Sequence, residues 1–148
     1  GRLHGMSEAA ASRRADQLAR LLDMTPLLER RTEGFSQGER MKTALARALV
    51  HDPPNIVLDE PTNGLDVLAT RALRDTLRRL RDDEGKCIVF STHIMQEVER
   101  LCDRVIIVAQ GRTVAEGTVA ALNASCGERD FEATFVKLAF GGGHGPQA

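Results

Sequence analysis

The stretch from Asn55 to Pro61 constrains the fold of this chain more than any other. An apolar run ending at Leu58 leads directly into two adjacent carboxylates, Asp59 and Glu60, and the proline then stops the strand. Such a continuous run is typical of a parallel strand covered on both faces, and its carboxyl end is where open α/β sheets bind ligands. Two acids there favour a magnesium-bound nucleotide, with one carboxylate holding the metal and the other polarising a water. Two solvated loop acids are the alternative interpretation.

A second candidate site precedes this strand, at the start of a predicted helix. Ser36 followed three residues later by Glu39 fits a capping box, in which the two residues satisfy each other's backbone N–H groups. The same helix start could bind an anion, because its N–H groups are unpaired and Gly38 would let a phosphate come close. The local sequence leaves both readings open. Five apolar residues predict the buried face of the helix, which runs from Met41 to Val50: Met41, Ala44, Leu45, Ala48 and Leu49.

Strands and helices alternate from Asn55 onward, which predicts a mostly parallel sheet with helical crossovers. A turn at Gln110-Gly111 predicts a hairpin that forms one edge of this sheet. Capping residues predict further helices before and after it. The predicted elements are helices after Ser7 and Thr25, strand 55–58, helix 67–82, strand 87–90, helix 95–102, hairpin strands 105–108 and 113–115, and helices after Thr118 and Asp130.

Two further polar segments follow the strands. Asn63 to Asp66 is typical of a turn that leads into a helix, with Asp66 as the N-cap. Ser91-Thr92-His93 follows the second apolar strand. A lone histidine is usually structural or solvated, but His93 comes after a strand of the same predicted sheet as Asp59 and Glu60. It could therefore reach the same crevice and contact a terminal phosphate or a catalytic water.

Taken together, in this order and spacing, these segments resemble the ATP-binding cassette (ABC) ATPases, the motor subunits of ABC transporters. The resemblance runs from Phe35 to Gly117. Phe35 to Glu39 resembles the signature motif, Ile56 to Glu60 Walker B, Asn63 to Asp66 the D-loop, and Ser91 to His93 the switch-histidine loop. The resemblance implies an α/β fold with a P-loop NTPase-like, mostly parallel sheet, flanking helices and part of the ABC helical subdomain.

The resemblance also implies roles for individual residues. Asp59 would hold Mg²⁺ through water, and Glu60 would orient or deprotonate the water that attacks ATP. His93 would contact the γ-phosphate. Ser36 and Gly38 would contact the γ-phosphate of ATP held by the partner subunit of a dimer. The remaining members of the implied nucleotide-binding set are Gln37, Glu39 and Asp66, the last acting across the dimer interface.

The signature segment departs from the family pattern at two positions. Gln37 stands where the family commonly has glycine, and Glu39 where it commonly has glutamine. Glu39 adds negative charge near a γ-phosphate. If this carboxylate folds back into the capping box, the helix end partly neutralises it; if it points at the nucleotide, it weakens ATP-dependent dimer closure.

No G-x-x-x-x-G-K-[ST] sequence occurs in the 148 residues, so the chain shows no phosphate-cradling loop. The family's Q-loop would also precede the first residue. The chain therefore resembles the later two-thirds of a nucleotide-binding domain, and we expect it alone neither to bind ATP tightly nor to hydrolyse it. The expected domains are 1–34, partial helical subdomain; 35–117, C-terminal part of the ATPase core; 118–140, C-terminal helices; and 141–148, a disordered tail.

Composition adds few constraints. The net charge of −1 gives no broad attraction to nucleic acid, and the arginines of the helix over 67–82 are interleaved with aspartates, as on a solvated face. No apolar run approaches the ~18 residues of a membrane span. Three cysteines without C-x-x-C spacing indicate buried or incidental thiols in a reducing cytosol.

The resemblance implies an ATP-hydrolysing motor subunit that works as a dimer on a transmembrane permease, in the cytoplasm at the inner face of the membrane. The segments Ala46–Pro54 and Asp130–Phe140 resemble the bacterial sodium-exporting ABC ATPases, so we expect an exporter of sodium or of drugs. Two alternatives remain. One is a soluble ABC ATPase that is not coupled to transport, and the other is a non-catalytic truncated cassette that binds a partner ATPase.

Overall fold

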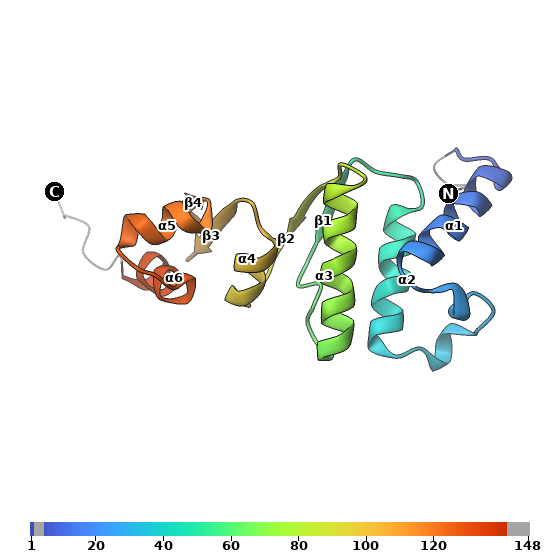
Figure 1. Cartoon of the computed structure of the whole chain (residues 1–148), viewed down its shortest axis with the longest axis horizontal. Coiled ribbons are helices and arrows are strands. Elements are labelled where there is room, and N and C mark those ends of the chain that lie inside the picture. The colour runs from blue at the N-terminus through green and yellow to red at the C-terminus, as the bar shows by residue number, and fades with distance from the viewer. Residues whose placement is uncertain (2–4, 142–148) are drawn as a thin grey trace. The chain divides into compact units, whose positions relative to one another are not determined.

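The computed structural model describes residue 1 and residues 5–141, and the chain divides into two compact units, Gly1–Ser91 and Thr92–Ala148. Figure 1 shows the order of the elements along the chain. Apart from Gly141, the tail predicted to be disordered lies outside the described residues. None of the helices in this described part is both long and apolar enough to cross a membrane.

The first unit begins with helices and ends with a parallel strand pair. Its elements are α1 (Glu8–Leu21), the short 3-10 helices η2 (Thr25–Leu27) and η3 (Thr32–Gly34), α2 (Gln37–Leu49), β1 (Asn55–Leu58), α3 (Val67–Asp82) and β2 (Cys87–Phe90). The second unit contains α4 (Met95–Leu101), β3 (Val105–Ala109), β4 (Arg112–Gly117), α5 (Val119–Cys126) and α6 (Phe131–Phe140).

The helix starts follow the predicted caps, because each cap accepts a hydrogen bond from a backbone N–H that the helix itself leaves unpaired. Each bond runs from the third residue after the cap to the cap's side-chain oxygen. The capping residues of α1, α2, α3, α5 and α6 are Ser7, Ser36, Asp66, Thr118 and Asp130. The predicted starts of these five helices are therefore confirmed.

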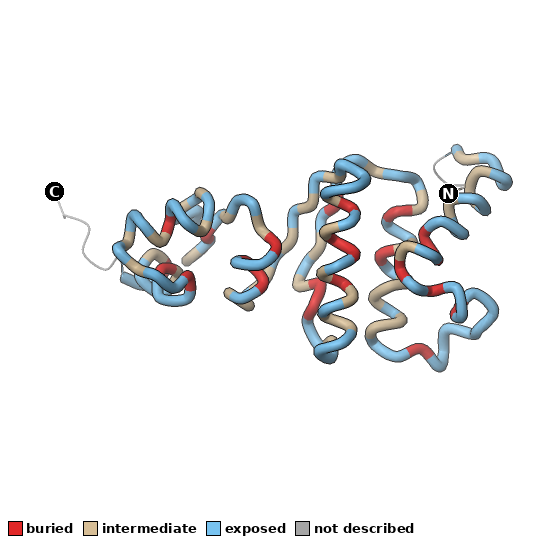
Figure 2. Tube along the Cα trace, in the orientation of Figure 1, coloured by how far each residue is buried: buried red, intermediate tan, exposed pale blue. Residues whose placement is uncertain are grey.

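The β1–β2 pair is parallel, with Ile56 opposite Ile88. The expectation that β1 is covered on both faces is wrong for this chain. Ile56 is 4% exposed, whereas Val57 is 79% and Val89 58% exposed. Side chains of a strand alternate between faces, so an apolar run can bury only the face against which another element packs. Helix α3 contacts β2. Buried residues recur along α3, as Figure 2 shows; they are Leu73, Thr76, Leu77 and Leu80.

Helix α2 shows the same one-sided burial. Leu45 and Leu49 are buried, as predicted, and Met41 is half-buried. Ala44 and Ala48, which were expected on the buried face, are exposed. Helix α1 contacts α2, and Gly38 in the first turn of α2 lies beside Ala69 of α3. Only the residues of α2 that are turned toward such neighbours are buried.

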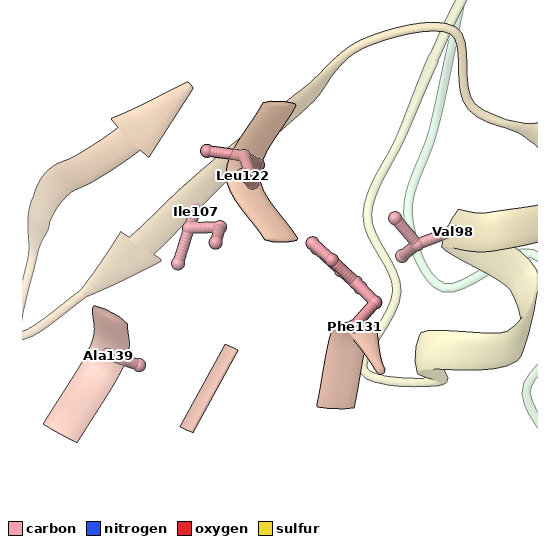
Figure 3. Packing of buried hydrophobic residues seen from close by; sticks show 5 residues of the cluster. All are labelled: Val98, Ile107, Leu122, Phe131 and Ala139. Atoms are coloured by element: carbon pink, nitrogen blue, oxygen red, sulfur yellow. The ribbon is translucent and has the colours of Figure 1, made fainter. Parts of the chain in front are cut away.

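The second unit has its own hydrophobic core, in which side chains from four elements meet. Figure 3 shows Val98 of α4, Ile107 of β3, Leu122 of α5, and Phe131 and Ala139 of α6. The predicted hairpin is confirmed: β3 and β4 pair antiparallel, with an irregularity after Ile107. The expectation that it forms one edge of the parallel sheet is wrong for the described residues, because β3 and β4 hydrogen-bond only to each other and form a two-stranded sheet of their own. The last helix therefore docks on its own unit through Phe131, which is 1% exposed.

Candidate functional site

The carboxyl end of β1 presents the two carboxylates next to a hydroxyl from the neighbouring strand. Ser91 follows β2, and its backbone N–H donates to the carbonyl of Leu58 at 3.0 Å, which continues the pairing of the two strands. Its Oγ donates to Oδ1 of Asp59 at 2.5 Å and accepts from the backbone N–H of Glu60 at 2.8 Å. One serine thus contacts both predicted site residues of Walker B.

Glu60 adopts a backbone conformation that side-chain-bearing residues rarely adopt. Its φ is 42°, in the left-handed region, which costs on the order of 1–2 kcal/mol for a residue with a Cβ. Its carbonyl accepts from the N–H of Asn63 at 3.0 Å, which closes a tight turn directly after the strand. Strained residues of this kind persist only where the surrounding structure holds them in place, and they are common at functional sites.

The oxygen atoms of Asp59 and Glu60 fit a hard divalent cation. Mg²⁺ is usually bound by one or two carboxylates together with water and substrate phosphates, and not by a cage made only of protein ligands. No cluster of three or more metal-ligating side chains occurs within residue 1 and residues 5–141.

The start of α2 forms the predicted capping box. The N–H of Glu39 donates to Ser36 Oγ at 3.2 Å, and the N–H of Ser36 donates to Oε2 of Glu39 at 2.7 Å. Arg30 donates to the other oxygen, Oε1, at 2.8 Å, and its guanidinium lies over the ring of Phe35 at 5.5 Å. The backbone N–H of Ser36, and then the charge of Arg30, lower the pKa of the Glu39 carboxyl. Of the two predicted orientations, Glu39 therefore takes the one that folds back.

The start of α2 lies against the segment that follows β1 and against the first turn of α3. Gln37 Nε2 donates to the carbonyl of Asn63 at 3.3 Å, and its side chain lies where a Cβ on Gly64 would be. A Cβ on Gly38 would lie 3.1 Å from the Cβ of Ala69 in the first turn of α3. Gly38 thus has a packing role beside helix α3, and its predicted approach to a phosphate stays a prediction.

Asp66 is the N-cap of α3, as predicted, with its Oδ1 accepting from the N–H of Ala69 at 2.8 Å. The two residues that follow it are apolar and exposed: Val67 is 84% and Leu68 78% exposed. The D-loop segment therefore presents a carboxylate and two apolar side chains at one helix start.

His93 belongs to the second unit and is exposed. Its neighbour Thr92 shapes the turn into α4: Thr92 Oγ1 accepts from the N–H of Ile94 at 3.1 Å and donates to Oε2 of Glu97 at 3.3 Å. Glu97 is fully buried. The contact expected between His93 and a terminal phosphate stays a prediction.

Ser91 and Arg30 are the two site residues that sequence reasoning missed. Ser91 lies in the switch-histidine segment, in which only His93 was predicted to have a role in the site. A usable signal existed, because a hydroxyl one residue beyond β2 must lie near the residue one beyond β1 when the two strands pair in register. No sequence pattern predicted the contact between Arg30 and Glu39, because the two residues are nine positions apart and belong to no regular repeat.

Comparison with known proteins shows which sequences this chain resembles. Residues 2–63 match the family model described as ABC transporter. The chain is 39% identical to "ABC transporter ATP-binding protein NatA" from Bacillus subtilis (strain 168) over 136 residues, which is 92% of this chain and 55% of that protein. It is 42% identical to "Nod factor export ATP-binding protein I" from Burkholderia lata (strain 383) over 122 residues, which is 82% of this chain and 40% of that protein.

Two solved structures share the fold. One is the ATP-binding subunit of an ABC transporter, with a TM-score of 0.77, 34% identity, and coverage of 93% of this chain and 59% of that one. The other is a dimeric post-hydrolysis state of the ATP-binding cassette MJ0796 bound to ADP and Pi, with a TM-score of 0.65, 26% identity, and coverage of 76% and 49%. The chain belongs to the ATP-binding domains of ABC transporters, and it spans about half the length of the relatives it matches.

Proposed function

We propose that this chain is part of the ATP-hydrolysing motor subunit of an ABC transporter, and that it supplies the catalytic carboxylate. In this proposal Glu60 orients or deprotonates the attacking water, Asp59 holds Mg²⁺ through water, and His93 contacts the γ-phosphate. The observation that carries the proposal is the pair Asp59–Glu60 at the carboxyl end of a parallel strand, where Ser91 Oγ bonds the carboxylate of Asp59 and the backbone N–H of Glu60. Bound Mg²⁺ would neutralise charge that develops on the phosphates.

The start of α2 faces ATP that is held by a second subunit. Ser36, Gln37, Gly38 and Glu39 form this surface, and Asp66 acts across the interface between the two subunits. The capping box and Arg30 support the proposal, because they neutralise the carboxylate of Glu39 where it would otherwise repel a phosphate. The dimeric arrangement of the related cassette bound to ADP and Pi supports a second subunit as the partner.

The proposed partners are a second ATPase subunit, with a homodimer favoured, and a transmembrane permease; nucleic acid is not among them. The motor would lie in the cytoplasm on the inner face of the membrane. The word "export" in the name of one relative supports an exporter, whose cargo is sodium or a drug. We assign residues 1–34 to part of the helical subdomain, 35–117 to the C-terminal part of the ATPase core and 118–140 to C-terminal helices.

The 148 residues alone are not expected to turn over ATP. They contain no G-x-x-x-x-G-K-[ST] sequence, and phosphate cradling supplies much of the positioning on which phosphoryl transfer depends. The proposed activity therefore belongs to this chain joined to a phosphate-binding segment such as its longer relatives can provide.

The test replaces the carboxylate in such a complete subunit. Glu60→Gln should lower kcat for ATP by at least about 100-fold, the lower end of what general acid–base catalysis contributes, and leave the affinity for ATP within a few-fold. Glu132→Gln is the matched control, since Glu132 is exposed in the first turn of α6, and it should leave kcat unchanged. Full turnover by the Glu60→Gln subunit would overturn the proposal.

A further inference from the structure

The hydroxyl of Ser91 makes two hydrogen bonds of opposite direction to adjacent residues. It has one hydrogen, which it donates to Asp59 Oδ1 at 2.5 Å, and a lone pair, which accepts from the N–H of Glu60 at 2.8 Å. The first distance is in the short range of hydroxyl bonds to a carboxylate, which are stronger than bonds between neutral groups. The one hydrogen of this hydroxyl and one of its two lone pairs thus bind the adjacent residues Asp59 and Glu60.

The position of this hydroxyl is set by the sheet. Leu58 pairs with Phe90 in the last register position of β1 and β2, and the N–H of Ser91 continues the pairing to the carbonyl of Leu58 at 3.0 Å. The backbone it holds is strained, since the φ of Glu60 is 42°. A strained residue persists only where neighbouring groups fix its conformation, and the bond to the N–H of Glu60 does this directly.

We propose that Ser91 is a positioning residue for ATP hydrolysis, which rests on the function proposed above for Glu60. Ser91 does not act on the nucleotide itself. It holds the backbone of Glu60 in the left-handed conformation that aims its carboxylate, and it fixes one oxygen of Asp59. Without the hydroxyl, the backbone of Glu60 and the carboxylate of Asp59 can shift. A shift of about 1 Å in a catalytic group can cost on the order of 100-fold in rate.

The first test needs no nucleotide and uses the 148-residue chain. Amide hydrogen exchange at Glu60 is compared in the native chain, Ser91→Ala and Ser91→Thr, with Ser125→Ala as a control. The hydroxyl of Ser125 donates to the backbone carbonyl of Leu122 in the second unit and makes no bond to Asp59 or Glu60. Ser91→Ala should raise the exchange rate of the Glu60 amide at least about tenfold, and threonine should restore protection. Unchanged exchange at Glu60 in Ser91→Ala would overturn the inference.

The second test measures ATP turnover in the complete subunit, with Glu60→Gln assayed in parallel. Ser91→Ala should lower kcat at least about tenfold, leave KM for ATP within twofold, and regain activity as Ser91→Thr. If Glu60→Gln removes turnover while Ser91→Ala keeps it, the role of Ser91 is wrong and the proposed function stands. If Glu60→Gln itself keeps full turnover, the proposed function fails.

Discussion

Gly64 offers a sharp test of how the start of α2 is joined to the D-loop segment. Its φ is +71°, and a Cβ added there would overlap Nε2 of Gln37 and lie 3.0 Å from its Cδ. Gly64→Ala therefore has two effects. It places a side-chain-bearing residue in the left-handed region, and it expels the Gln37 amide from its bond to the carbonyl of Asn63.

The two effects have different magnitudes. Left-handed backbone costs a residue with a Cβ about 1–2 kcal/mol. Loss of the Gln37 hydrogen bond adds about 0.5–1.5 kcal/mol. Gly85 is the matched control, because its φ is +64° and a Cβ there would meet nothing within 4 Å. Gly85→Ala should cost the first amount only, so Gly64→Ala should exceed it by about 1 kcal/mol.

The assay is urea unfolding of the 148-residue chain, followed by circular dichroism. The excess cost of Gly64→Ala over Gly85→Ala should disappear when both are repeated in a Gln37→Ala background, since the alanine leaves room for the new Cβ. Equal costs for the two glycine substitutions in the native background would show that Gln37 does not lie over Gly64, and the reasoning would be refuted.

Three further predictions concern charge and packing. Glu39→Gln should leave ATPase activity of the complete subunit unchanged or raise it, because glutamine also completes a capping box; a large loss of activity would contradict this. Phe131→Ala should destabilise the second unit by about 3–5 kcal/mol in thermal unfolding, whereas Val136→Ala, 52% exposed, should have a small effect. A hydrogen bond from Lys86 lowers the pKa of Asp52, so its stabilisation is present above the ordinary aspartate pKa and is lost as the pH falls below about 4. Asp52→Asn should remove this part of the pH dependence, roughly 0.5–1 kcal/mol for so exposed a carboxylate, and urea unfolding between pH 3 and 6 that shows no difference would contradict it.

Helix starts and strand ends were predictable because their causes lie within a few residues. Ser36 and Glu39 are three residues apart and complete each other's hydrogen bonds whatever the rest of the chain does. Asp66 caps α3 in the same way. The order of apolar strands and polar ends also predicted the parallel pairing of β1 and β2, because the connection between them is a helix.

Contacts between distant segments were not predictable from local patterns. The apolar run of β1 gives no sign that Val57 is exposed, since hydrophobicity reports what could be buried and not which neighbour is present. Arg30 reaches Glu39 through a bend in the chain that has no periodicity. Gln37 departs from the family pattern, and only the structure shows that its amide contacts the segment after β1.

The most direct measurement of the central claim is a calorimetric titration of the 148-residue chain with Mg-ATP. In our proposal this chain supplies the water-activating carboxylate and the surface that faces a partner's nucleotide, whereas a separate phosphate-binding segment supplies the tight binding of ATP. We therefore expect no detectable heat of binding. Clear saturable binding would show that a nucleotide site forms without the phosphate-cradling loop, and would contradict this division of roles.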